Sequence, residues 1–179
     1  TEIARRFRRQ VGESLATLLQ RLEKIPGLRR LTFITSHPTH IDETLMRVIR
    51  DHPVHARYLH LPVQSGSNRV LQAMNRGYTA ENYRHTIDMT RRIVPDLSPA
   101  TDWIVGFPGE TDDDFAASES MLSDLEFQTS FVFRYSVRSG TKAAKLMPDD
   151  VLESDKESRN IRLLEVQEAQ SSRLHRARI

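Results

Sequence analysis

The sequence TDWIVGFPGETDDDF, residues 101–115, combines a short apolar strand, a glycine-containing turn and the start of a helix. The run WIV at 103–105 predicts the strand, and the glycines and proline of 106–109 predict the turn. Thr111 is a favourable N-cap, and the three aspartates that follow it lie where the helix dipole stabilises negative charge. Such a turn leaves backbone N–H groups beside a gap, which suits a polar ligand. An ordinary strand-to-helix junction has the same pattern, so this stretch alone leaves both interpretations open.

The same construction recurs along the chain. Apolar runs predict strands at 31–35, 58–63, 100–106 and 130–135. Helical apolar spacing predicts the helices between them, and the expected N-caps are Ser14, Asp42, Ser67, Thr79 and Thr111. The order βαβαβαβα predicts an α/β fold in which a parallel sheet of four strands, joined by right-handed crossovers, has flanking helices. Four strands form either an open sheet or an arc of a larger barrel.

Polar segments follow each predicted strand: SHP at 36–38, QSGS at 64–67, GFPGET at 106–111 and YSVRSGT at 135–141. Ligands of parallel sheets bind at the carboxyl ends of the strands. The sequence therefore predicts a polar-ligand site at one rim, with Gln64, Gly106 and Ser136 on it.

Several residues near this rim are candidates for binding. Gln64 and Ser65 either read hydroxyl or carboxylate groups of a ligand or shape the turn before the next helix. Arg76 either pairs with a carboxylate bidentately or lies in solvent. Asp102 faces the opposite side of its strand from Trp103, and a carboxylate within a buried parallel strand needs a partner or a ligand.

Composition limits the class of protein. The 179 residues fit one domain, and 38% apolar with 28% charged residues is typical of a soluble fold. No apolar run is long enough to cross a membrane and residues 1–10 lack the apolar core of a signal peptide, so we expect a cytoplasmic protein with no membrane partner. The net charge is only +2, although arginines cluster within 5–9 and 173–178. These clusters either contact phosphates or are solvated surface.

The chain contains no cysteine. Disulfides, thiolate nucleophiles and zinc or iron–sulfur sites held by thiolates of this chain are therefore excluded. His37 and His40 have a spacing that a metal could use, but no third ligand is evident, and we predict no metal site.

The C-terminal part is polar. Residues 142–153 resemble a linker, and a capping box at 154–157 predicts a helix that runs to the end of the chain. Its thin apolar stripe suggests a helix laid against the edge of the domain, or a connection to another domain.

Four of these segments resemble one family. The SHP run at 36–38, YLHLPVQSGSNRVLQAMNRGYT at 58–79, TDWIVGFPGETDDDF at 101–115 and YSVRSGTKAA at 135–144 resemble the radical S-adenosylmethionine (SAM) methylthiotransferases. Within that family they are most similar to the enzymes that act on N6-isopentenyladenosine in tRNA. Four motifs in the same order make the resemblance specific, and it covers about residues 14–170.

The resemblance implies a partial six-stranded (β/α)6, TIM-like barrel, of which residues 1–150 would supply the third to sixth strands. Residues 151–179 would be a helix leading to a further domain. It also implies SAM as cofactor, with Gln64, Ser65 and Arg76 at its methionine or ribose end and Asp102, Ile104 and Tyr135 along its body. This chain departs from the family pattern because the CxxxCxxC motif that binds the SAM-cleaving [4Fe–4S] cluster is missing.

By resemblance, the parent enzyme would have an N-terminal domain with a second cluster, a C-terminal RNA-binding domain, tRNA as substrate and an electron donor protein. The leading hypothesis is therefore a piece of a tRNA methylthiotransferase that is inactive alone. A stand-alone, non-catalytic module that binds RNA or a protein is a second hypothesis. An enzyme for another phosphate- or nucleotide-bearing substrate, which would use the GFPGET turn, is a third.

Overall fold

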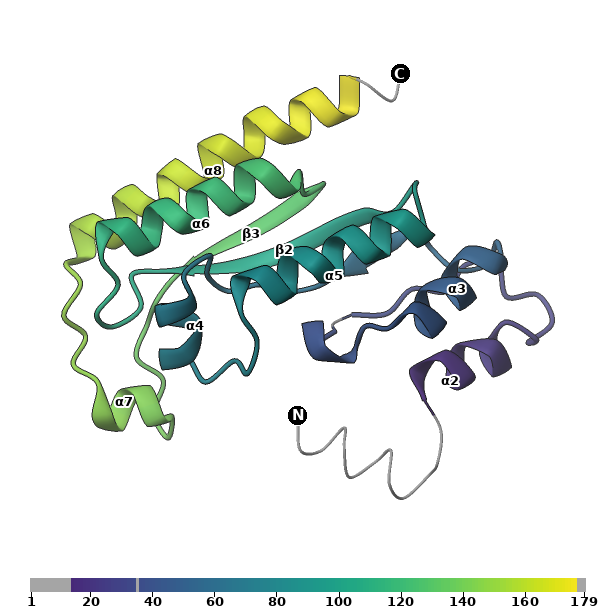
Figure 1. The fold of residues 1–179 in the computed structure, drawn as a ribbon, viewed down its shortest axis with the longest axis horizontal. Helices are drawn as coiled ribbons and strands as arrows, with labels where there is room; N and C mark the ends of the chain where they lie inside the picture. Colours follow the sequence, from purple (N-terminus) through teal and green to yellow (C-terminus); the bar gives the residue numbers. More distant parts are fainter. Residues whose placement is uncertain (1–13, 35, 177–179) are drawn as a thin grey trace.

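The computed structural model describes residues 14–34 and 36–176 (Figure 1). The basic cluster at 5–9 and Arg178 lie outside the described residues. The elements, in order, are α2 (Leu15–Leu22), the 3-10 helix η1 (Pro38–His40), α3 (Glu43–Asp51), β1 (Tyr58–His60), α4 (Asn68–Ala73), α5 (Ala80–Ile93), β2 (Ser98–Val105), α6 (Asp112–Leu125), β3 (Thr129–Arg134), α7 (Lys142–Leu146) and α8 (Glu153–Arg176).

The sheet is parallel and its strands follow sequence order, β1-β2-β3. This confirms the predicted α/β class with a parallel sheet, but the sheet has three strands rather than four. In the described part of the expected strand, 31–34, Leu31 makes an isolated parallel bridge with His55; further along, Ser36 N donates to His60 O of β1 at 3.2 Å. Ile34 is 74% exposed, so this apolar segment is not buried on both of its faces.

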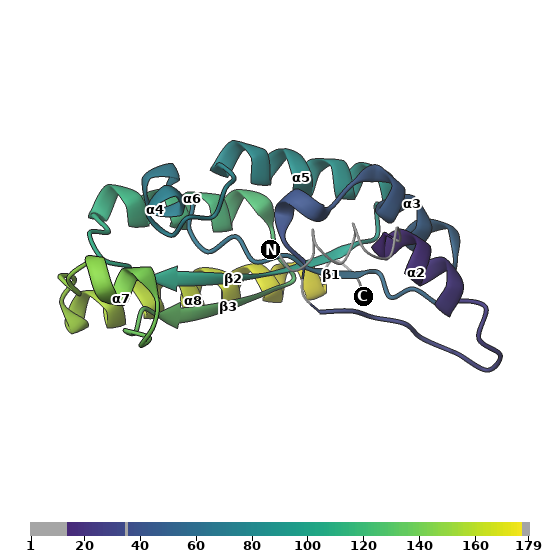
Figure 2. The same ribbon diagram turned by 90° about the horizontal axis from the view of Figure 1, so that it is seen from below.

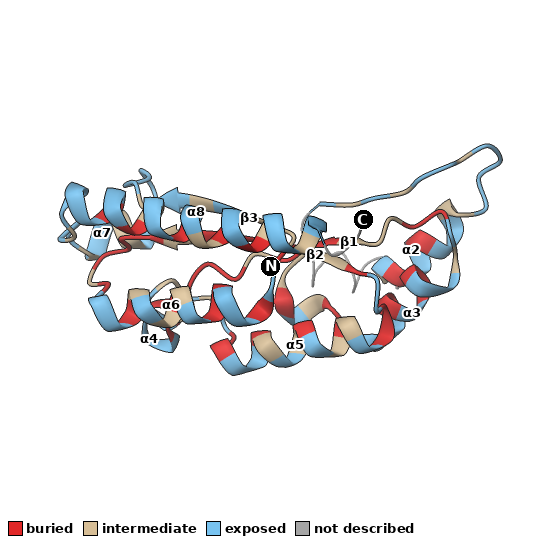
Figure 3. Ribbon diagram, turned by 90° about the horizontal axis from the view of Figure 1, so that it is seen from above, coloured by how far each residue is buried: buried red, intermediate tan, exposed pale blue. Residues whose placement is uncertain are grey.

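The core lies between one face of the sheet and the helices. Figure 2 shows α4, α5 and α6 on one side of β2 and β3. Alternate residues of β2 point to this side, and Trp103 is fully buried with its ring edge-on to Phe127, 6.1 Å between centroids. On the other face, Phe131 and Phe133 of β3 are 47% and 53% exposed. Buried residues recur at helical spacing along α5, α6 and α8 in Figure 3.

The predicted helix starts depend on local hydrogen bonds and are largely confirmed. The side chains of Ser14, Asp42, Ser67, Thr79 and Thr111 each accept a backbone N–H from the first turn of their helix. The predicted capping box at 154–157 is wrong, because α8 already begins at Glu153. The expected linker at 142–153 contains the short helix α7.

Helix α8 packs against α6 and β3. Leu163 of α8 is fully buried, but the other buried residues on this face of the helix are polar or charged. The side-chain amide of Gln167 donates to Phe127 O at 3.2 Å, and that of Gln170 donates to Leu122 O at 3.0 Å. Because these amides satisfy backbone carbonyls of the neighbouring elements, the helix docks with only a thin apolar stripe. No described helix combines the length and apolar character needed to cross a bilayer.

Candidate functional site

A cavity of about 560 Å³ lies at the carboxyl ends of β2 and β3, a volume within the usual range for small-molecule sites. Its lining comes from the turn after β1, the end of α4, the open face of the sheet and the segment between β3 and α7. The lining residues are Gln64, Ala73, Met74, Asn75, Arg76, Asp102, Ile104, Phe107, Phe133, Arg134, Tyr135, Ser136, Arg138, Thr141, Lys142 and Ala143.

Five of the six candidate binding residues line this cavity, namely Gln64, Arg76, Asp102, Ile104 and Tyr135. Ser65 does not. It is fully buried, its Oγ lies 3.3 Å from Ser118 Oγ on α6, and it accepts the backbone N–H of Ser67 at 3.1 Å. The side chain of Ser65 therefore fixes the turn after Gln64 to α6.

The backbone of Gln64 extends the sheet beyond β1. Its N–H donates to Asp102 O and its carbonyl accepts from Ile104 N, both at 2.9 Å. Its φ is +76°, in the left-handed region that side chains other than glycine seldom adopt. Two hydrogen bonds to β2 thus hold a strained residue at the edge of the cavity.

The cavity presents both polar and apolar groups. Among the described residues, Arg76 Nε and Tyr135 Oη are buried without a hydrogen-bond partner. Asp102 has the partner that its strand position required, since one carboxylate oxygen lies 2.8 Å from His60 Nε2, and its side chain remains 23% exposed. The ring of Tyr135 packs edge-on against Phe107, 5.1 Å between centroids. Such a site suits a ligand with an aromatic ring and several polar groups.

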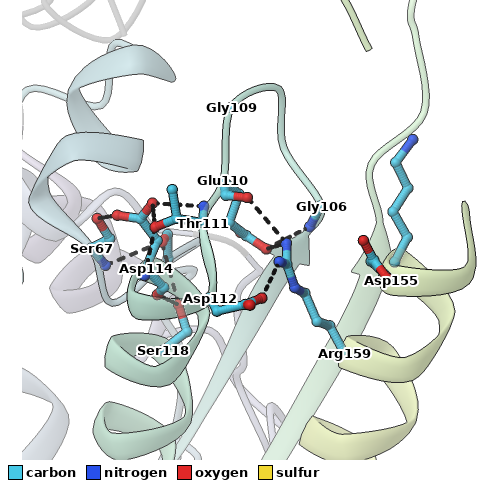
Figure 4. Close-up of polar contacts among 12 residues, drawn as sticks. Ser67, Gly106, Gly109, Glu110, Thr111, Asp112, Asp114, Ser118, Asp155 and Arg159 are labelled. Atoms are coloured by element: carbon cyan, nitrogen blue, oxygen red, sulfur yellow. Dashed lines mark hydrogen bonds and ion pairs between the residues drawn. The ribbon is translucent and has the colours of Figure 1, made fainter. Parts of the chain in front are cut away.

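The GFPGET turn is held by the protein itself (Figure 4). Gly106 N donates to a carboxylate oxygen of Glu110 at 2.8 Å, and Gly109 N donates to Asp150 at 2.7 Å. The expectation that this turn offers free N–H groups to a ligand is therefore wrong for these two glycines. Their φ angles of +71° and +75° explain why glycine occupies both positions.

Glu110 forms a buried ion pair with Arg159. Its side chain is 1% exposed, and it lies 3.0 Å from Arg159 Nη1 on α8, whose other terminal nitrogen lies 2.7 Å from Asp112. Burial raises the pKa of Glu110 above its ordinary value, although Gly106 N–H and Arg159 act in the opposite direction. The pair links α8 to the turn after β2.

Asp114 links α4 to α6. Burial alone would raise its pKa, but hydrogen bonds from Arg69, Ser67 and Thr111 outweigh this effect and hold the pKa well below its ordinary value. One of these bonds, from Ser67 Oγ to Asp114 Oδ1, is 2.5 Å long. A charged network thus joins α4, whose end lines the cavity, to α6.

Residues 7–122 match the family model of the Radical SAM superfamily. The chain belongs to the radical SAM superfamily. The tRNA-2-methylthio-N(6)-dimethylallyladenosine synthase of Neisseria gonorrhoeae is 47% identical over 164 residues, which cover 92% of this chain and 37% of that protein. The enzyme of the same name from Rhodopirellula baltica is 45% identical, over 91% of this chain and 34% of that protein. The resemblance to tRNA methylthiotransferases is confirmed, and the chain spans little more than a third of these relatives.

Two solved structures share the fold of this radical SAM chain. Coproporphyrinogen III oxidase (HemN) of Escherichia coli superposes with a TM-score of 0.56 at 20% identity, over 78% of this chain and 31% of that one. Elp3 of Methanocaldococcus infernus gives 0.54 at 19% identity, over 75% and 31%. These likenesses concern the fold alone.

The residues of this radical SAM chain fit SAM but not a cluster. Arg76 Nε and Tyr135 Oη, which have no hydrogen-bond partner among the described residues, line the same cavity as the Asp102 carboxylate, and these groups suit the carboxylate, ammonium and hydroxyl groups of an amino acid joined to a nucleoside. The sequence has no cysteine, and no group of three metal-ligating side chains occurs within 14–34 and 36–176. His37 Nδ1 instead lies 2.8 Å from Thr39 Oγ1.

Sequence reasoning missed part of the lining. Phe107 lies inside the quoted GFPGET turn, and its position directly after a strand was an available signal. Phe133 follows from the period-two alternation of β3. Arg138 and Lys142 are cationic residues on a segment whose path over the cavity no local pattern predicts.

Proposed function

We propose that this chain is the SAM-binding part of a tRNA methylthiotransferase, which adds a methylthio group to C2 of N6-isopentenyladenosine. The observation that carries the proposal is the 47% identity with a tRNA-2-methylthio-N(6)-dimethylallyladenosine synthase over 92% of the chain. The cavity at the strand ends supports it.

In this proposal each cavity residue has a defined role toward SAM. Arg76 pairs with the methionine carboxylate, since its Nε has no partner in the described structure. Gln64 and Asp102 accept hydrogen bonds from the ribose hydroxyls or the ammonium group. Ile104 and the Tyr135 ring enclose the adenine. Ser65 acts indirectly, because its bonds to α6 fix the backbone turn that presents Gln64.

Without cysteine, the chain does not fit a [4Fe–4S] cluster, so we propose that it is inactive alone. The parent protein would supply the cluster ligands, a second cluster domain, an RNA-binding domain, and contacts to tRNA and an electron donor protein in the cytoplasm. Residues 1–150 would then supply part of the barrel, with β1, β2 and β3 among its strands, and residues 151–179 would be a helix leading to the next domain.

A non-catalytic module that binds RNA or a protein remains the second candidate. The observation that favours it is the same absence of cysteine. The coding sequence upstream of Thr1 separates the two candidates: a CxxxCxxC motif within about a domain's length supports the enzyme, and its absence supports the module.

A SAM titration of the chain, followed by NMR chemical shifts, tests the site. We expect a Kd no tighter than roughly millimolar, because the cluster that would chelate the methionine end is absent. Arg76→Ala should weaken binding about tenfold or more, the value of a charged hydrogen bond. Arg92→Ala, whose side chain is 68% exposed, is the matched control and should bind like the wild type. Equal affinity of the two variants would contradict the role of Arg76, and micromolar binding would show a pocket complete without its cluster.

A further inference from the structure

Lys156 of α8 is buried beside the cavity although it does not line it. Its side chain is 4% exposed, and its Nζ lies 2.7 Å from Asp149 and 3.7 Å from Glu153. Lysine is seldom buried to this extent, because removing the ammonium group from water is costly unless it is paired. The position of this side chain is therefore well defined.

The aliphatic part of Lys156 packs on the turn after β2. A Cβ placed on Gly106 would collide with Lys156 Cγ, so the glycine lets the lysine stem lie directly against the backbone. The contact joins α8 to the strand end that bears Asp102 and Ile104.

The ammonium group of Lys156 lies over an aromatic ring. Its Nζ is 5.7 Å from the centroid of the Tyr135 ring, within the distance of a cation–π interaction. Phe107 packs edge-on against the same ring. Tyr135 is thus held by the lysine and the phenylalanine, while its hydroxyl has no hydrogen-bond partner within the described residues.

We propose that Lys156 is a positioning residue for the cavity: it fixes the Gly106 turn and holds the Tyr135 ring in the orientation that forms the cavity wall. The inference rests on the proposed function in taking SAM as the ligand. A ring that samples other orientations lowers the apparent affinity by the fraction of time spent in the binding-competent one.

Arg159, three residues further along α8, has a different task. Its partners among the described residues are Glu110, Asp112 and the Phe115 ring, so it anchors the turn rather than the Tyr135 ring. The two cations of α8 should therefore be separable by experiment.

Lys156→Met tests the proposal, because methionine keeps an unbranched stem against Gly106 and removes the charge. The chain has four tyrosines, so ring-labelled tyrosine gives a simple NMR spectrum in which Tyr135→Phe identifies the Tyr135 signal. We expect the Tyr135 signal to move and broaden in Lys156→Met, and SAM to bind about fivefold more weakly. The unfolding midpoint should fall, because Lys156→Met removes only one member of the ion pair, but it should fall less than for a fully buried pair, since Asp149 and Glu153 are 31% and 65% exposed and remain hydrated. Lys145→Met, an exposed position on α7, is the control and should change none of these.

An unchanged Tyr135 signal and unchanged SAM affinity in Lys156→Met would overturn the proposal. If Lys156→Met fails to fold, Asp149→Asn, which loosens the ammonium group, must move the Tyr135 signal. If the wild type shows no SAM shifts even at about ten times the expected millimolar Kd, the assignment of this cavity to SAM fails, and the Tyr135 signal without ligand still decides the role of Lys156.

Discussion

Arg159→Met leaves a carboxylate buried without its cation. The side chains of Glu110 and Arg159 are 1% and 9% exposed, whereas the second partner of Arg159, Asp112, is 99% exposed and adds little. Removing one member of a buried pair costs about 3 kcal/mol or more of unfolding free energy. For a chain of this size, that loss lowers the unfolding midpoint by about 6–12 °C.

The loss should depend on pH. Because the pKa of Glu110 is raised above its ordinary 4.5 in the folded state, the folded protein binds this proton more readily than the unfolded chain. The stabilisation from this group is complete below 4.5 and is lost as pH rises through the raised folded value. Removing Arg159 takes away an interaction that lowers the pKa of Glu110. This pKa therefore rises further, and the pH range over which Glu110 stays protonated in the folded protein extends to higher pH. The deficit of Arg159→Met relative to wild type should therefore be largest at neutral pH and shrink as the pH falls.

Urea unfolding followed by circular dichroism at several pH values measures this deficit. The double variant Glu110→Gln/Arg159→Met keeps an acceptor for Gly106 N–H without a charge, and it should recover most of the lost stability at neutral pH. Arg162→Met breaks a pair whose side chains are 56% and 28% exposed and should cost less than about 0.5 kcal/mol. A deficit that is constant with pH and persists in the double variant would refute the buried-pair argument.

Three further outcomes are expected. Gly66→Ala should lose about 3 kcal/mol in urea unfolding, because its Cβ would lie 2.6 Å from Ala117 C and 2.7 Å from Ser118 Cα on α6; Ser118→Ala, which removes the hydroxyl that bonds Ser65, Gly66 N and Asp114 O but introduces no clash, should lose about 1–2 kcal/mol. Anaerobic reconstitution of the chain with iron and sulfide should give no stoichiometric [4Fe–4S] absorbance or EPR signal, and a robust cluster would mean that histidine or carboxylate ligation was underestimated. Binding of tRNA should be weak and fall at least about tenfold between low and high salt if terminal arginines such as Arg173 and Arg176 contact phosphates; salt-insensitive, sequence-selective binding would favour the stand-alone module.

The features predicted from sequence are those that depend on neighbouring residues or on a general rule of topology. Helix caps such as Thr111 need only the next three residues. The presence of Gln64 and Ser136 in the lining of one cavity follows from the rule that parallel strands end at a common rim. Neither prediction required knowledge of which helices touch.

The errors have a common physical origin in contacts between distant parts of the chain. Asp150, which accepts Gly109 N–H, and Arg159, which pairs with Glu110, both come from a region that the sequence showed only as polar. The segment at 31–35 has the composition of a strand, but within its described part, 31–34, only Leu31 makes a bridge to the chain before β1. Composition alone does not reveal whether a neighbour covers both sides of such a segment.

At position 64, the backbone conformation favours glycine, whereas the cavity lining needs the glutamine side chain. Its φ of +76° costs about 1–2 kcal/mol for a side-chain-bearing residue, and glycine would adopt it freely. A screen that selects only for thermal stability should therefore favour glycine here and discard the amide that lines the cavity. Consensus or stability-guided engineering of this chain would need to hold residue 64 fixed, since the more stable variant would be the one that has lost a side chain from the cavity lining.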